Sequence, residues 1–190
     1  AVPEDMPIYV WLLEQGFIIK KRAEVLGMVT RHSCALCVAG THGKTTTSTM
    51  LAHILHGSHL GASAFLGGIA NNYHSNLLLD AESELVVVEA DEFDRSFHHL
   101  TPYMSVITSM DADHLNVYGT EAAYRESFVH YAGLVQKALV VHKRVIDSGE
   151  KFAAQGEREK ATVYSYAVGE KADFYADNVR VEDGQIYFDF

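Results

Sequence analysis

Four short, uninterrupted apolar runs constrain the fold of this chain more than any other feature of its sequence. Continuous apolar strands are typical of a parallel sheet whose two faces are both covered by helices. Helical patterns follow two of these runs, and the alternation of strands and helices indicates the α/β class. The sequence therefore predicts a mostly parallel sheet with helices on both faces. The four runs occupy residues 34–39, 84–90, 104–109 and 138–142.

Both predicted helices carry apolar stripes at helical spacing. The first occupies residues 44–56. The second extends from about residue 120 to residue 137, and Thr120 is a candidate N-cap because its hydroxyl can accept a bond from a free amide. The side chains expected to be buried are Met50, Leu51, Ile54 and Leu55 in the first helix, and Ala123, Tyr124, Phe128, Tyr131 and Val135 in the second.

The two ends of the chain differ from this central pattern. Residues 1–31 contain two helical segments and no strand, which predicts the tail of a preceding domain and places the main domain at residues 32–190. Near the C-terminus, three short apolar runs predict short antiparallel strands, and an Asp-Gly pair between the last two is typical of a hairpin turn. These runs are residues 162–168, 176–181 and 185–190.

Composition narrows the classes of function. The formal charge is −10, from 15 Lys and Arg against 25 Asp and Glu, which argues against a nucleic-acid backbone as partner. No apolar run approaches the roughly 20 residues that span a bilayer, and the start lacks a signal-peptide pattern. Only two cysteines occur, which suits a reducing, cytoplasmic setting. Cys34 and Cys37 lack the second pair that a zinc site needs, so we interpret them as core residues.

The stretch CVAGTHGKTTTSTM, at residues 37–50, is the main candidate for a binding site. Glycines let backbone amides converge on an anion, and the N-terminus of a following helix favours negative charge. The lysine could pair with phosphates, and the next threonine could hold magnesium. The P-loop pattern is incomplete, because Val38 stands where its first glycine is expected, and a tight turn with a solvated lysine is the alternative. The candidate nucleotide-binding residues are Gly40, Thr41, His42, Gly43, Lys44, Thr45 and Thr46.

Two further strand ends carry side chains that a nucleotide site needs. One apolar run ends in Glu89, and another is followed by Asp113 and His114. The carboxyl ends of parallel strands meet at one sheet edge where ligands bind, and carboxylates suit magnesium. A structural histidine is the alternative for His114. The acids that follow Glu89, for which a solvated loop is an equal alternative, are Asp91, Glu92 and Asp94.

Three stretches, in this order, resemble the Mur ligase family: GTHGKTTT, VVEADEFDRSFHHLTP and ITSMDADHLNVYGT. The first 26 residues are also similar to the end of that family's UDP-binding domain. The histidine of GTHGKT distinguishes the branch that acts on UDP-N-acetylmuramate from relatives that carry asparagine. The resemblance implies a P-loop-type sheet, ATP and Mg²⁺ as cofactors, and UDP-N-acetylmuramate and L-alanine as substrates.

Mur ligases have a UDP-binding domain, a central ATPase domain and a C-terminal domain that binds the amino acid. The resemblance implies that residues 1–31 are the tail of the first domain and residues 32–190 an incomplete central domain. The H-N-x-x-N motif that contacts adenine in the family is absent from the chain. Such a fragment is expected not to form the amide by itself, because ligation needs both reactants held in line.

The resemblance also assigns roles. ATP and magnesium would activate the muramoyl carboxylate as an acyl phosphate, which the amine of alanine then attacks. Lys44 and His114 are the catalytic candidates: Lys44 would stabilise the γ-phosphoryl group, and His114 would hold a second magnesium. Thr45 and Glu89 would bind the first magnesium. Asp113 would orient His114, the ligand of the second magnesium, without contacting the ion itself. The candidate substrate contacts are His42, Gly67, Gly68, Asp91 and Arg95.

Two residues depart from the family pattern, and other functions stay open. The stretch YRESFVHY has no lysine for the carbamylation seen in several relatives, and Asn116 stands where aspartate is frequent. The alternatives are a ligase that recycles murein tripeptide, a P-loop binding module without ligase chemistry, and a fragment with no competent site. The oligomeric state is not predicted. Because Lys44 is interpreted as a phosphate contact outside the core, Lys44→Ala is expected to change stability by at most about 1 kcal/mol.

Overall fold

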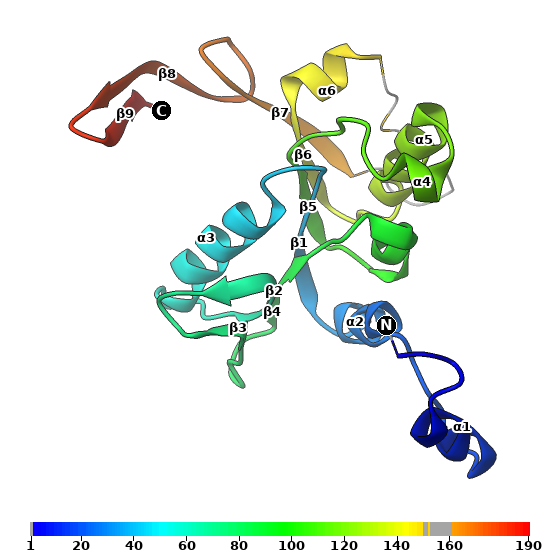
Figure 1. Cartoon of the computed structure of the whole chain (residues 1–190). Coiled ribbons are helices and arrows are strands. Elements are labelled where there is room, and N and C mark those ends of the chain that lie inside the picture. The colour runs from blue at the N-terminus through cyan, green and yellow to red at the C-terminus, as the bar shows by residue number, and fades with distance from the viewer. Residues whose placement is uncertain (1, 150–151, 153–160) are drawn as a thin grey trace.

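The computed structural model describes residues 2–149, 152 and 161–190 (Figure 1). Within them, nine strands form one sheet in the order β3-β2-β4-β1-β5-β6-β7-β8-β9. The strands are β1 Cys34–Ala39, β2 Ser63–Ala70, β3 Ser75–Leu78, β4 Leu85–Glu89, β5 Met104–Ile107, β6 Ala138–His142, β7 Thr162–Val168, β8 Phe174–Glu182 and β9 Gln185–Asp189. The helices are α1 Pro7–Glu14, α2 Arg22–Arg31, α3 Lys44–His56, η1 Phe93–His99, α4 Leu115–Tyr118, α5 Glu121–Ala132 and α6 Lys143–Asp147.

Most neighbouring strands run parallel, which confirms the predicted fold class. Parallel pairing extends through the sheet from β2 to β8, and only the outer pairs β2–β3 and β8–β9 are antiparallel. The antiparallel direction predicted for residues 162–168 is therefore wrong, because β7 pairs parallel with β6. The connection from β6 contains α6 and is long enough to return the chain to the same end of the sheet. The β8–β9 hairpin is confirmed, with positive φ angles at Asp183 and Gly184.

Strands β2 and β3 were not predicted from the sequence. The stretch SAFLGGIA of β2 contains Gly67 and Gly68, and glycine weakens the signal of a strand because it has no side chain to pack. β2 nevertheless pairs parallel with β4 at Ser63, Ala64 and Phe65. This pairing places Gly67 and Gly68 beside the carboxyl end of β4, where the candidate site lies.

Alternate residues of β4 enter two separate cores, one on each face of the sheet. Val86 and Val88 belong to a cluster that includes Phe128 of α5, whereas Val87 packs in a second cluster with Ala52 of α3. Figure 1 shows α3 on one side of the central strands and α5 on the other. The sheet is thus covered on both faces, as the continuous apolar runs predict.

Helix α3 begins and ends at the predicted residues, but its buried face differs from the prediction. Met50 and Ile54 are exposed at 60% and 63%, whereas Ser48 and Ala52 are buried. The small side chains of Ser48 and Ala52 allow the helix to approach the sheet closely, and this places the larger pair outside. Only Leu51 and Leu55 of the predicted stripe pack against the core.

Helix α5 has the predicted start, and Tyr124, Phe128 and Tyr131 of its predicted stripe are buried. Ala123 is only partly buried, and Val135 is buried beyond the end of the helix. The Thr120 hydroxyl accepts a bond from the amide of Ala123 at 3.1 Å, which is the expected N-cap. The helix ends at Ala132, earlier than the predicted residue 137, and the Tyr131 hydroxyl lies 2.8 Å from Ser105 Oγ of β5. In the part of the chain that the structure describes, we find no helix with the length and apolar character needed to traverse a membrane.

Candidate nucleotide-binding site

The glycine loop joins β1 to α3 at the carboxyl edge of the sheet. Gly43 precedes α3 in a left-handed conformation (φ 82°), and no side chain caps the helix, so its first amides are available to an anion. At Gly40 (φ 134°), a Cβ atom would lie 2.1 Å from Thr108 Oγ1, which explains the glycine. A hollow of about 260 Å³ is lined by residues 41–46. The loop and helix start therefore form a cradle suited to phosphate.

The end of β5 holds the loop in place. The amide of Thr41 donates to the carbonyl of Ser109 at 3.1 Å, and the amide of His42 donates to Ser109 Oγ at 2.9 Å. Thr108 Oγ1 donates to the carbonyl of His42 at 2.5 Å. These bonds fix the backbone and leave the His42 side chain exposed.

The Thr41 hydroxyl connects the loop to the core on the α5 face. It lies 2.7 Å from the hydroxyl of Tyr124 and donates to the carbonyl of Asp111 at 2.8 Å. Burial raises the pKa of Tyr124 well above its ordinary value, so this phenol stays neutral. The loop is thus anchored to the core through a hydrogen bond between Thr41 and the buried, protonated Tyr124 hydroxyl.

Tyr124→Phe is expected to lower the free energy of unfolding by about 1 kcal/mol, because it removes one buried hydrogen bond while keeping the ring. Urea denaturation of the two proteins measures this difference. Tyr175→Phe, on an exposed ring of β8, is the matched control and should change stability by less than about 0.5 kcal/mol. Equal stability of the Tyr124→Phe and Tyr175→Phe variants would show that the Thr41–Tyr124 bond contributes nothing.

Glu89 and Thr45 lie side by side. Thr45 Oγ1 donates to Glu89 Oε1 at 3.1 Å, and the amide of Gly67 donates to Glu89 Oε2 at 2.9 Å. A Cβ atom on Gly67 would lie 2.2 Å from Glu89 Oε1, and one on Gly68 would lie 3.3 Å from Thr45 Cγ2. The two glycines predicted as substrate contacts thus provide the space in which Glu89 meets Thr45.

This pair of oxygen groups fits a magnesium ion bound together with phosphate. Among the described residues, no group of three or more His, Cys, Asp or Glu side chains could hold a metal by itself. Magnesium does not need such a group, because it usually takes one or two carboxylates, substrate phosphates and water. The hydroxyl of Thr45 and the carboxylate of Glu89 are hard donors beside the phosphate cradle, which suits this mode.

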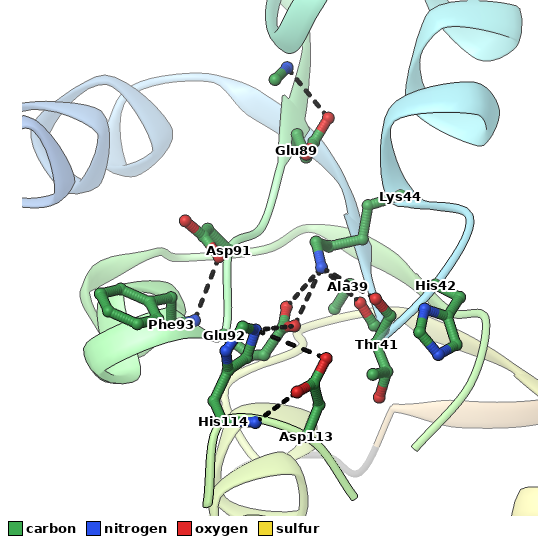
Figure 2. Close-up of polar contacts among 12 residues, drawn as sticks. Ala39, Thr41, His42, Lys44, Glu89, Asp91, Glu92, Phe93, Asp113 and His114 are labelled. Carbon is green, nitrogen blue, oxygen red and sulfur yellow. Dashed lines mark hydrogen bonds and ion pairs between the residues drawn. The ribbon is translucent and has the colours of Figure 1, made fainter. Parts of the chain in front are cut away.

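Lys44 faces the carboxylate of Glu92, a pairing that the sequence did not predict. Its Nζ lies 2.7 and 3.0 Å from the two carboxylate oxygens of Glu92 and donates to the carbonyl of Gly40 at 2.8 Å (Figure 2). The side chain of Glu92 is 0% exposed and that of Lys44 is 14% exposed. Burial raises the pKa of Glu92, and the Lys44 ammonium opposes this shift. Of the two alternatives left open for Glu92, the solvated loop is wrong, because the side chain is buried where Tyr118 of α4 packs against the segment that follows β4.

His114 approaches the same buried carboxylate. Its Nε2 atom lies 3.7 Å from Glu92 Oε1 and 3.9 Å from Asp113 Oδ2. The amide of His114 donates to Asp113 Oδ1 at 2.6 Å, and the residue has a positive φ of 53°. The structure therefore brings His114 and Lys44 together around Glu92 (Figure 2). Glu89 instead contacts Thr45 and Gly67.

The other two candidate substrate residues lie in different surroundings. Asp91 is exposed, accepts a bond from the amide of Phe93, and lines a small hollow with Glu89 and Arg22. The guanidinium of Arg95 lies 4.8 Å from the centre of the Tyr118 ring. Asp91 thus borders the Glu89 side of the site, and the Arg95 guanidinium lies over the Tyr118 ring.

The sequence and the fold of this chain are similar to those of known proteins. Residues 38–190 match the Mur ligase middle domain. A UDP-N-acetylmuramate–L-alanine ligase from Phocaeicola vulgatus is 53% identical over the whole chain, which covers 40% of that relative. The solved UDP-N-acetylmuramate-alanine ligase from Thermotoga maritima has 26% identity and a TM-score of 0.71, over 93% of this chain and 39% of its own.

A second solved structure shares the fold at lower identity. The UDP-N-acetylmuramate:L-alanyl-gamma-D-glutamyl-meso-diaminopimelate ligase from Neisseria meningitides is 22% identical, with a TM-score of 0.76 over 98% of this chain and 64% of its own. The present chain spans about 40% of the length of the curated relatives it matches. Since the family match covers most of its residues, the chain belongs to the Mur ligase family.

Proposed function

We propose that this chain is the ATP-binding part of a ligase that joins L-alanine to the carboxylate of UDP-N-acetylmuramate in peptidoglycan precursor synthesis. The observation that carries this proposal is the contact of Thr45 with Glu89 beside the phosphate cradle of the GTHGKT loop. The 53% identical relative that bears this enzyme name supports the substrates. The low cysteine content suits a reducing compartment, so the proposed location is cytoplasmic.

We further propose that residues 1–31 belong to the tail of the UDP-binding domain and residues 32–190 to the central domain. The family match starts at residue 38, after the N-terminal helices. Helix α1 buries none of its residues, and Trp11 and Phe17 are exposed at 49% and 57%. These features support packing partners in another domain for α1, whereas Leu26 of α2 packs in the core of the central domain.

The proposed chemistry has two steps. A muramoyl carboxylate oxygen attacks the γ-phosphorus of ATP, the bond from that phosphorus to the β,γ-bridging oxygen breaks, and ADP leaves. The amine of alanine then attacks the acyl carbon, loses a proton, and inorganic phosphate leaves with the electron pair of the broken C–O bond. Both steps concentrate negative charge, which preorganised cations stabilise.

Each site residue has a task in this scheme. The Lys44 ammonium, held by Glu92 and the Gly40 carbonyl, would neutralise charge on the transferred phosphoryl group. Thr45 and Glu89 would hold magnesium, which supplies further neutralisation when bound. His114 would hold a second magnesium, and Asp113, bonded to its backbone, would orient it. The assigned substrate-side residues are His42, Gly67, Gly68, Asp91 and Arg95.

Phosphate release by the full-length protein that contains this chain tests the proposal. With UDP-N-acetylmuramate, ATP and Mg²⁺ present, adding L-alanine should start phosphate release and yield the amide. Replacing alanine by murein tripeptide should give much slower release. Faster release with the tripeptide would identify a recycling ligase instead, and nucleotide binding without any amine-dependent release would identify a binding module.

A further inference from the structure

We propose that Glu92 is a positioning residue that holds the Lys44 ammonium and the His114 ring in one arrangement for phosphoryl transfer. This inference rests on the function proposed above. It assigns a task to a carboxylate that neither the phosphate cradle nor the Thr45–Glu89 pair uses.

The burial of Glu92 is the first observation. Its side chain is 0% exposed, and a buried carboxylate is costly unless a cation compensates it. The compensating cation is Lys44, whose Nζ lies within 3.0 Å of both carboxylate oxygens. A pair of this kind is weak evidence for stability, because apolar residues of similar size usually serve as well. Its position at the catalytic lysine therefore points to a functional reason.

The backbone around Glu92 is firmly held. Its carbonyl accepts a bond from the buried Tyr118 hydroxyl and a second from the amide of Arg95 at 3.0 Å. The Arg95 guanidinium covers the Tyr118 ring at 4.8 Å. The backbone from which the Glu92 side chain extends is therefore fixed, and groups that contact its carboxylate are held at defined positions.

Two groups, the Lys44 ammonium and the His114 ring, are held in this way. Lys44 has a flexible four-carbon stem, and the contacts from Glu92 and the Gly40 carbonyl hold its ammonium at one place. His114 Nε2 lies 3.7 Å from Glu92 Oε1, and the ring of the adjacent Phe93 meets the His114 ring edge to face at 5.3 Å. Residues 92 and 93 thus set the places of both groups from one short segment.

The charge of Glu92 gives this role a distinctive kinetic signature. A carboxylate next to Lys44 repels the triphosphate and competes for the ammonium, so it does not favour ground-state binding. It favours transfer by keeping the cation aligned, and interactions that act only in the transition state raise kcat. Removing the charge should therefore lower kcat without raising KM for ATP.

Steady-state kinetics of Glu92→Gln in the full-length protein test the proposal. We expect kcat to fall by about tenfold or more, with KM for ATP unchanged or lower. Asp94→Asn is the matched control, because it removes an exposed carboxylate from the same segment, and its kcat should equal that of the wild type. Asparagine also tolerates the positive φ of 51° at this residue.

Glu92→Asp decides the question if Glu92→Gln does not fold. It keeps the charge but shortens the side chain by one carbon, which moves the carboxylate away from Lys44. The kcat value should therefore lie between those of the wild type and Glu92→Gln, while KM for ATP stays unchanged. A wild-type kcat in the variants that fold, or a raised KM for ATP at constant kcat, would overturn the positioning role. Failure of the wild-type protein itself to release phosphate on adding alanine would instead overturn the proposed function.

Discussion

Lys44→Ala in the full-length protein is expected to remove most of the proposed ligase activity and to lower the free energy of unfolding by roughly 3 kcal/mol. The loss of activity follows from the missing positive charge at the phosphoryl group. The loss of stability follows from Glu92, which is 0% exposed and would remain without its cation. This prediction is larger than the change of about 1 kcal/mol expected from the sequence, because the sequence does not reveal the buried partner.

A double-mutant cycle separates these effects. Urea denaturation of the wild type, Lys44→Ala, Glu92→Gln and the double variant should show that Glu92→Gln restores part of the stability lost in Lys44→Ala. The exposed Lys20→Ala variant is the matched control and should stay within about 0.5 kcal/mol of the wild type. A Lys44→Ala variant as stable as Lys20→Ala would contradict the buried ion pair.

Gly67→Ala is expected to disable the magnesium site with a large effect on nucleotide binding. The added Cβ would lie 2.2 Å from Glu89 Oε1 and 2.4 Å from its Cδ, so the carboxylate must leave Thr45. The gain in ATP affinity that magnesium provides should then fall by about tenfold or more, since Glu89 is a proposed ligand.

Calorimetric titration of full-length Gly67→Ala with ATP, with and without Mg²⁺, measures this effect. Gly57→Ala, at the far end of α3, is the control: its Cβ would meet only the His53 and Ile54 carbonyls, at 3.3 and 4.0 Å, and magnesium dependence should be retained. Retention of the full magnesium effect in Gly67→Ala would remove Glu89 from the proposed site.

The parts of the fold that depend on local signals could be predicted. The glycine loop separates an apolar run from a helical pattern, and β1 and α3 accordingly have the predicted bounds. Thr120 marks the start of α5 through a local hydrogen bond. Strand ends in a parallel sheet share one edge, which is why Glu89 could be expected near Thr45.

The parts that depend on tertiary packing could not be predicted. Glu92 has the sequence surroundings of a solvated loop, and its burial arises only when η1 and α4 enclose it. The direction of β7 depends on its long-range pairing with β6, because its sequence pattern fits either direction. The buried face of α3 depends on Ser48, whose small size matters only against the sheet.

A crystal structure of the full-length protein with Mg²⁺ and a non-hydrolysable ATP analogue tests the central claim most directly. The account predicts the triphosphate in the cradle of residues 41–46, with Lys44 at the γ-phosphate. Magnesium should lie about 2.1 Å from Thr45 Oγ1, and Glu89 should bind it directly or through one water. A triphosphate bound away from this cradle, or a magnesium ion that contacts neither Thr45 nor Glu89, would contradict the account.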